Sequence, residues 1–183
     1  MAGERILTIC GALRASSTNR LLVAEARRIY GAADYEEADL RLPLYDGDLE
    51  AEEGIPEGVA RLTAQIAAAD GILISTPEYN KMIPGVLKNA LDWVSRTKGN
   101  PWADKPVAIL SAAGGRGGGD RSQFSLRLAL APFQVRIAPG PEVLIANSGQ
   151  AFDGEGRLID ERAIRAVTGL MAAFRREMAR SGA

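Results

Sequence analysis

The sequence predicts an α/β protein in which helices cover both faces of a parallel sheet, giving a three-layer sandwich. Three observations support this fold class: strand-like and helix-like segments alternate along the chain, internal repeats are absent, and no linker divides the 183 residues. Five strands in the order 2-1-3-4-5 of a doubly wound sheet fit this alternation. A chain of this length has room for one substantial core, so residues 1–183 are expected to form a single domain.

Short apolar runs rich in β-branched residues predict the strands. The runs lie at residues 5–10, 34–40, 71–75, 106–112 and 142–146. Four of them are almost continuously apolar, as strands buried on both faces are. The run at 34–40 instead interleaves polar and apolar residues, which suits a strand at the edge of the sheet.

Apolar residues at spacings of three and four predict amphipathic helices between the strands. The predicted helices cover residues 21–30, 56–69, 84–96, 121–131 and 160–180. Pro56 and Pro84 are interpreted as first helical residues, because that position needs no amide hydrogen. Residues 41–55 and 97–105 are read as loops, and residues 152–159 as a turn or small hairpin.

The composition excludes several classes of function. Histidine is absent, which removes Ser-His-Asp and Cys-His nucleophiles and histidine-ligated zinc. The 22 Lys and Arg residues nearly balance the 23 Asp and Glu residues, which argues against electrostatic binding of nucleic acid. No signal peptide or membrane span is recognisable, so we expect a cytoplasmic protein that does not enter a membrane.

Two local features are given structural interpretations. Cys10, the only cysteine, is interpreted as a packed thiol at a strand end. The carboxylates of Asp46, Asp48 and Glu50 match no calcium loop, and Asp-Gly-Asp is common in turns, so no metal site is expected. The sequence leaves two roles open for Tyr45 in the same loop: contact with a partner subunit, or contact with a ligand.

The loop after the first strand has the composition of an anion site. Residues 11–20, GALRASSTNR, combine a glycine turn, hydroxyl groups and arginines just before a helix. Free amides and the dipole at a helix N-terminus favour a phosphate group. An ordinary helix cap explains the same residues equally well. The loop lacks the Gly-Lys-Ser/Thr ending of a Walker A motif, which argues against a kinase or nucleotide hydrolase.

Two further loops follow the third and fourth strands. Residues 78–81 place a carboxylate, an aromatic ring, an amide and a cation together, and residues 113–120, AGGRGGGD, are glycine-rich. Glycines let a backbone approach a flat ligand closely, or simply flex. In the order 2-1-3-4-5 the switch point lies between the first and third strands, where open α/β sheets bind ligands. The sequence therefore predicts that all three loops meet at one site.

The motifs GALRASSTNR and TPEYNKMIPGVLKNALDWVSR resemble those of the NADPH-dependent FMN reductase family of flavodoxin-like proteins, which includes quinone, azo-dye and chromate reductases. PLYDGDLE and GGGDRSQFSLR are similar to the family as well. The resemblance implies a flavodoxin-like fold with FMN as cofactor and NAD(P)H as co-substrate. Hydride would pass to flavin N5 and then to a small-molecule acceptor by a ping-pong mechanism, without a catalytic side chain. It also implies a homodimer or homotetramer, with Tyr45 and residues 121–127 at the contact.

The same resemblance implies which residues surround the cofactor. Its phosphate would be bound by the first loop, through Arg14, Ser16, Ser17 and Asn19. Its ring would lie against the second and third loops, at Pro77, Glu78, Tyr79, Asn80, Lys81, Ala113, Gly114, Gly115 and Arg116. The charge of Lys81 would stabilise the reduced ring, and Arg116 would meet the 2′-phosphate of NADPH. The chain departs from the family pattern at Ala12, Ser16, Lys81 and Ala113, which motivates an alternative, a flavodoxin-like module that binds FMN or a partner without turnover.

Overall fold

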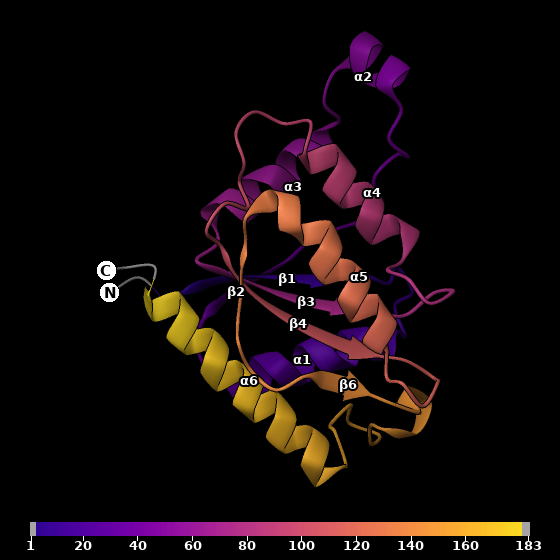
Figure 1. Cartoon of the computed structure of the whole chain (residues 1–183), viewed down its shortest axis with the longest axis vertical. Coiled ribbons are helices and arrows are strands. Elements are labelled where there is room, and N and C mark those ends of the chain that lie inside the picture. The colour runs from indigo at the N-terminus through magenta and orange to yellow at the C-terminus, as the bar shows by residue number, and fades with distance from the viewer. Residues whose placement is uncertain (1–2, 181–183) are drawn as a thin grey trace.

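The computed structural model, which describes residues 3–180, is a parallel sheet with helices on both faces (Figure 1). The sheet has the order β2-β1-β3-β4-β5, with β6 also paired to β4, and all pairs are parallel. Its strands are β1 (Arg5–Cys10), β2 (Asp34–Glu37), β3 (Gly71–Thr76), β4 (Pro106–Ala112), β5 (Arg136–Ile137) and β6 (Val143–Ile145). The predicted fold class and strand order are confirmed.

The outer edge of β4 departs from the prediction, because two short strands share the place of one. β5 pairs with the start of β4, and β6 pairs with its last three residues. Residues 138–142, APGPE, separate them. Proline has no amide hydrogen for a ladder, so this segment cannot continue the strand. At the other edge, β2 ends at Glu37 rather than at residue 40.

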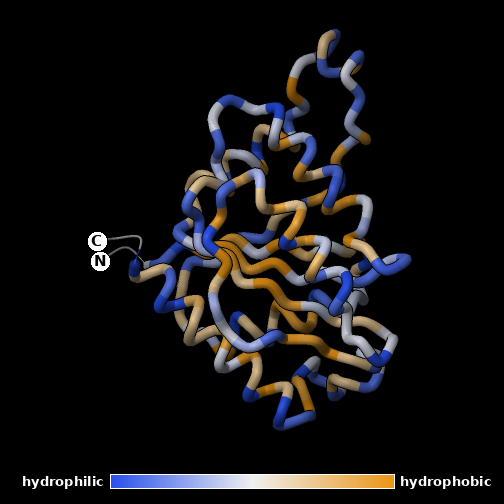
Figure 2. The backbone as a smooth tube through the Cα atoms, viewed as in Figure 1, coloured by the Kyte–Doolittle hydropathy of each residue, from blue (hydrophilic) through white to orange (hydrophobic). Residues whose placement is uncertain are grey.

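Alternate residues of the central strands pack on opposite helical layers. Ile6, Leu73 and Leu110 belong to the cluster with α1 and α6, whereas Leu7 and Ile72 belong to the cluster with α3, α4 and α5. Figure 2 shows the apolar strands at the centre of the molecule. The bounds of these helices are α1 (Thr18–Tyr30), α3 (Glu57–Ala68), α4 (Gly85–Val94), α5 (Asp120–Leu130) and α6 (Glu161–Ala179). None of the helices in the described part of the chain is long and apolar enough to cross a membrane.

The sequence suggested that Pro56 and Pro84 are the first residues of their helices. In the structure both residues precede their helices, at the cap position. Both have extended ψ angles, 145° and 147°. Their carbonyl oxygens accept the first helical hydrogen bonds, from Val59 and Leu87. Proline at this cap position therefore fixes where each helix starts without entering it.

The segment predicted as a loop at residues 41–55 contains a short helix, α2 (Gly47–Glu53), which projects from the body of the molecule (Figure 1). Asp46 caps it by accepting a hydrogen bond from the amide of Asp48 at 2.9 Å. None of its residues is buried. The prediction failed because a helix without a core-facing side has no apolar stripe to reveal it.

A buried carboxylate ties α1 to the turn at residues 152–159. Glu25 accepts two hydrogen bonds of 2.8 Å from the guanidinium of Arg28, and the guanidinium of Arg157 lies 3.7 Å away. The hydrogen bonds from Arg28 hold the pKa of Glu25 below its ordinary value of 4.5. A carboxylate with a lowered pKa contributes stability above its ordinary pKa and loses it as the pH falls through the lowered one.

Glu25→Gln is therefore expected to lower the free energy of unfolding at neutral pH by about 1.5–3 kcal/mol, the range for hydrogen bonds to charged groups. The deficit should shrink as the pH falls from the ordinary pKa of 4.5 through the lowered one, because the wild-type carboxylate then takes up a proton. Urea unfolding across this pH range measures the stability deficit. Glu161→Gln, which removes one partner of an exposed ion pair, is the control. A deficit that is independent of pH would contradict the assignment.

Candidate functional site

The three loops predicted to form one site do meet, at the carboxyl edge of the sheet, around an open pocket of about 160 Å³. The lining residues are Arg14, Ser17, Thr18, Asn19, Pro77, Glu78, Tyr79, Ala112, Ala113, Gly114 and Ser148. Three pockets are larger: two of about 310 and 370 Å³ lie at the opposite edge, beside Arg5 and Lys105, and one of about 190 Å³ lies between α1 and α6. We select the smaller pocket because it lies at the switch point of the sheet and collects hydrogen-bond donors.

The first side of the pocket is the amino terminus of α1. Ser17 caps this helix, since its hydroxyl oxygen accepts from the amide of Asn19 at 3.2 Å. The first turn contains no acidic residue, so the positive end of the helix dipole is not neutralised there. Thr18 adds a hydroxyl that donates to the hydroxyl of Ser148 at 3.1 Å. These groups suit a phosphate, so the residues present fit the phosphate end of FMN.

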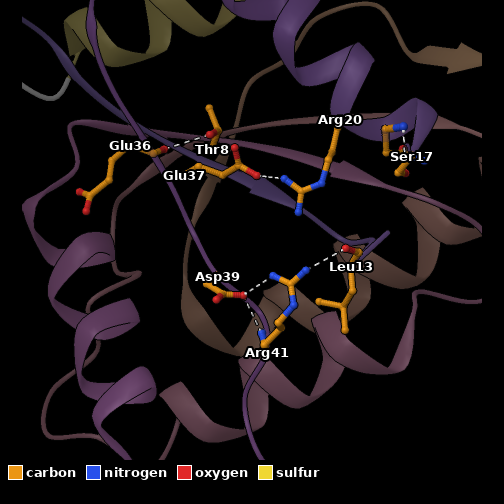
Figure 3. A network of polar contacts seen from close by, with 9 residues as sticks. Thr8, Leu13, Ser17, Arg20, Glu36, Glu37, Asp39 and Arg41 are labelled. Carbon is orange, nitrogen blue, oxygen red and sulfur yellow. Dashed lines mark hydrogen bonds and ion pairs between the residues drawn. The ribbon is translucent and has the colours of Figure 1, made fainter. Parts of the chain in front are cut away.

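Three arginines lie near the first loop, and two of them, Arg20 and Arg41, are held by contacts within the protein (Figure 3). Arg20 pairs with Glu37 at the end of β2. Arg41 donates to the backbone oxygen of Leu13 at 3.1 Å and pairs with the carboxylate that follows β2, at Asp39. Arg14 is exposed and forms no ion pair among residues 3–180. Its guanidinium is available for a ligand anion.

Asn19 lines the pocket, but its side chain is used inside the protein. It is buried, and its Oδ1 accepts from the hydroxyl of Ser75 at 2.8 Å and from the amide of Ala112 at 3.0 Å. Its Nδ2 donates to the carbonyl of Ala112 at 2.8 Å. This side chain therefore joins the start of α1 to the ends of β3 and β4. Its position favours a supporting role over the direct phosphate contact expected from the resemblance.

The second side of the pocket is a tight turn after β3. Tyr79 and Met82 exchange two backbone hydrogen bonds of 3.1 Å. Between them, Asn80 and Lys81 have φ angles of 50° and 66°, as both central residues of a type I′ turn require. Asparagine tolerates this left-handed conformation, whereas lysine does so at a cost. Glu78 and Tyr79 line the pocket, and the two central residues are exposed at the tip of the turn outside the lining.

The third side is the glycine loop after β4, whose two halves differ. Ala113 and Gly114 line the pocket, and a Cβ atom on Gly114 or Gly115 would meet no atom within 4 Å. Gly118 has a φ of 62°, and a Cβ there would lie 2.7 Å from the backbone of Leu144. The first half thus leaves open space beside the pocket, and the second is packed against β6. Gly115 itself lies outside the lining.

Of the predicted residues, the structure brings eight into the pocket lining and leaves five outside it. Those outside are exposed, and they are Ser16, Asn80, Lys81, Gly115 and Arg116. Sequence reasoning missed Thr18, Ala112 and Ser148. Ser148 starts a single 3₁₀ turn, η2 (Ser148–Gln150), and its amide donates to Ala113 at 3.1 Å. The Asn-Ser pair just past the fifth predicted strand was the available signal.

Comparison with known proteins gives one consistent family. Residues 5–150 match the family described as NADPH-dependent FMN reductase. An NAD(P)H-dependent FMN reductase of Pseudomonas aeruginosa is 44% identical over 161 residues, covering 87% of this chain and 86% of that protein. A quinone reductase of Escherichia coli is 37% identical over 174 residues, covering 93% of each.

Solved structures agree with the sequence comparison. A flavoenzyme NAD(P)H:(acceptor) oxidoreductase from Paracoccus denitrificans superimposes with a TM-score of 0.87 at 30% identity, over 97% of this chain and 98% of that one. The resemblance inferred from the loop motifs is thereby confirmed. The chain belongs to the NADPH-dependent FMN reductase family and is a flavin-dependent oxidoreductase.

Proposed function

We propose that the chain binds FMN in this pocket and passes a hydride from NAD(P)H to a quinone, a flavin or a similar small acceptor. Bound FMN supplies the hydride-accepting atom N5, so no side chain has to act as acid, base or nucleophile. The observation that carries the proposal is the amino terminus of α1 at the switch point, with its hydroxyls and the free guanidinium of Arg14. Family membership favours this enzyme over a binding module without turnover.

Each side of the pocket has a separate task in this proposal. Ser17, Thr18 and Arg14 bind the phosphate, and Ser16 is an exposed residue of the same loop outside the lining. The flavin ring would lie between the second loop, at Pro77, Glu78 and Tyr79, and the third loop, at Ala113 and Gly114. The open space beside Gly114 and Gly115 would leave room for a second small molecule next to the cofactor. Nicotinamide and acceptor would use this space in turn, as a ping-pong mechanism requires.

Two cations at the rim extend the proposal. Lys81, at the exposed tip of the turn after β3, favours ligands that carry negative charge. Arg116 is exposed in the glycine loop, and we assign it the 2′-phosphate of NADPH as its ligand. We also propose that the protein acts in the cytoplasm, in keeping with its one free, buried cysteine.

The chain is further proposed to act as a homo-oligomer. Large apolar side chains are exposed on α5 and the neighbouring turn, and they are Phe124, Leu128, Tyr79 and Met82. Ser125 on α5 accepts a hydrogen bond from the amide of Ile83 at 3.0 Å, so these two surfaces adjoin. Apolar side chains gathered in this way mark an interaction site. Tyr45 packs on Trp93 with ring centroids 5.0 Å apart and lies outside the pocket lining, which leaves it available to a partner subunit.

The function is tested by titrating the flavin-free protein with FMN and adding NADPH or NADH without oxygen. We expect a yellow complex that bleaches with nicotinamide and regains its colour when a quinone is added. Failure to bind FMN would contradict the proposal, and binding without bleaching would favour the module without turnover.

In the same assay, Arg116→Ala should lower the rate with NADPH more than the rate with NADH, and equal losses would refute the role of Arg116.

Arg14→Ala is expected to weaken FMN binding about 10- to 150-fold, because a charge-assisted hydrogen bond is worth roughly 1.5–3 kcal/mol. Riboflavin lacks the phosphate, so its affinity should not change. Fluorescence titration with both ligands measures the difference, and Arg165→Ala, in an exposed helical pair, is the matched control. Equal losses for FMN and riboflavin would show that Arg14 does not bind the phosphate.

Phe124→Ser is expected to shift the chain toward the monomer, because the side chain is 63% exposed in the isolated chain and contributes apolar area to the proposed contact. Sedimentation velocity of the wild-type and variant proteins checks this. Exposure also means that the variant should keep its fold. A wild-type chain that sediments as a monomer would contradict the proposed oligomer.

A further inference from the structure

One face of α5 contacts both ends of the turn after β3. Ser122 donates from its hydroxyl to the carbonyl of Pro77 at 2.8 Å, and Ser125 accepts from the amide of Ile83 at 3.0 Å. Residues three apart lie side by side on a helix, so the two serines together span the turn. The hydroxyl of Ser125 donates to the carbonyl of Ser122 at 3.0 Å, which orients its lone pairs toward Ile83.

The turn contributes a contact in return. Gly119, which precedes α5, has no side chain to cap the helix. The carboxylate of Glu78 lies 3.4 Å from the amide of Ser122 in the first turn. A carboxylate at a helix amino terminus is favoured by the free amides and by the dipole. The loop therefore supplies the missing cap of α5, and α5 fixes the position of Glu78.

These contacts matter because the turn between them is strained. Lys81 has a φ of 66°, which a residue with a Cβ atom adopts only when its surroundings hold it there. Neither central residue of the turn is buried. Beyond the two backbone hydrogen bonds between Tyr79 and Met82, the contacts that hold the turn are those at its two ends, and α5 provides them.

The same helical turn also reaches the glycine loop. Gln123 is buried, and its Nε2 donates to the hydroxyl of Ser111 at 3.0 Å and to the carbonyl of Val143 at 2.9 Å. Ser111 in turn donates to the carbonyl of Gly118 at 2.7 Å. Two of the three loops around the pocket are thus attached to the start of α5, although Ser122, Gln123 and Ser125 do not line the pocket.

We propose that Ser122 and Ser125 are positioning residues, which hold the turn at residues 77–83 in its binding shape before the flavin arrives. This inference rests on the proposed function, because it assumes that FMN is the ligand of the turn. A turn that is already ordered loses less conformational entropy when it binds, so its ligand binds more tightly. The two serines then influence the flavin only through the turn that they hold.

The first test is hydrogen exchange in the flavin-free protein. Ser125→Ala should raise the exchange rates of the amides of Tyr79, Met82 and Ile83 about fivefold, as expected for the loss of one net hydrogen bond. Ser125→Thr keeps the hydroxyl and should restore the slow rates. Thr168→Ala is the matched control, because that hydroxyl bonds only within α6. Amides of β3 serve as the internal reference, since a general loss of stability would raise their rates as well.

The second test measures FMN affinity and the reduction potential of the bound flavin in the same variants. We expect Ser125→Ala to bind FMN about fivefold more weakly and to shift the potential, with wild-type values in Ser125→Thr and Thr168→Ala. Ser122→Ala should act in the same direction. Unchanged exchange or unchanged FMN affinity in both alanine variants overturns the inference. A wild-type protein that fails to bind FMN refutes the proposed function instead, and the exchange rates still show whether α5 holds the turn.

Discussion

The hydrogen bonds of one buried amide side chain determine where the ligand site can form. Asn19 bonds to Ser75 at the end of β3 and to both backbone groups of Ala112 at the end of β4. These bonds fix the amino terminus of α1 at the point where the strand order reverses. A buried polar group that lost its partners would be costly, so the helix cannot easily move away from this place. The position of the hydroxyls of Ser17 and Thr18 follows from this constraint.

The other two loops are held by a second set of buried polar contacts, around α5. Ser122 is buried and bonds to the end of β3, and Gln123 bonds to the strands on either side of the glycine loop. Rigid elements thus carry the pocket, while its lining comes from loops, which is how binding sites are commonly built.

Much of the fold could be predicted because apolar runs and helical periodicity are local properties of the sequence. The three loops were recognisable from their composition, and their meeting point followed from the strand order. What could not be predicted depends on contacts between distant residues: that Asn19 bonds to residue 112, that Ser148 joins the pocket, and that Ser122 contacts Pro77. The helix α2 escaped notice for a different reason, since its only signals were the cap at Asp46 and acidic residues in its first turn.

The central claim is that the amino terminus of α1 binds the phosphate of FMN, and a crystal structure of the FMN complex tests it most directly. The account predicts the phosphate within hydrogen-bonding distance of the hydroxyls of Ser17 and Thr18 and of the guanidinium of Arg14. It also predicts the flavin ring between Tyr79 and Gly114. A flavin bound at the opposite edge of the sheet, or one whose phosphate points away from α1 into solvent, would contradict the account.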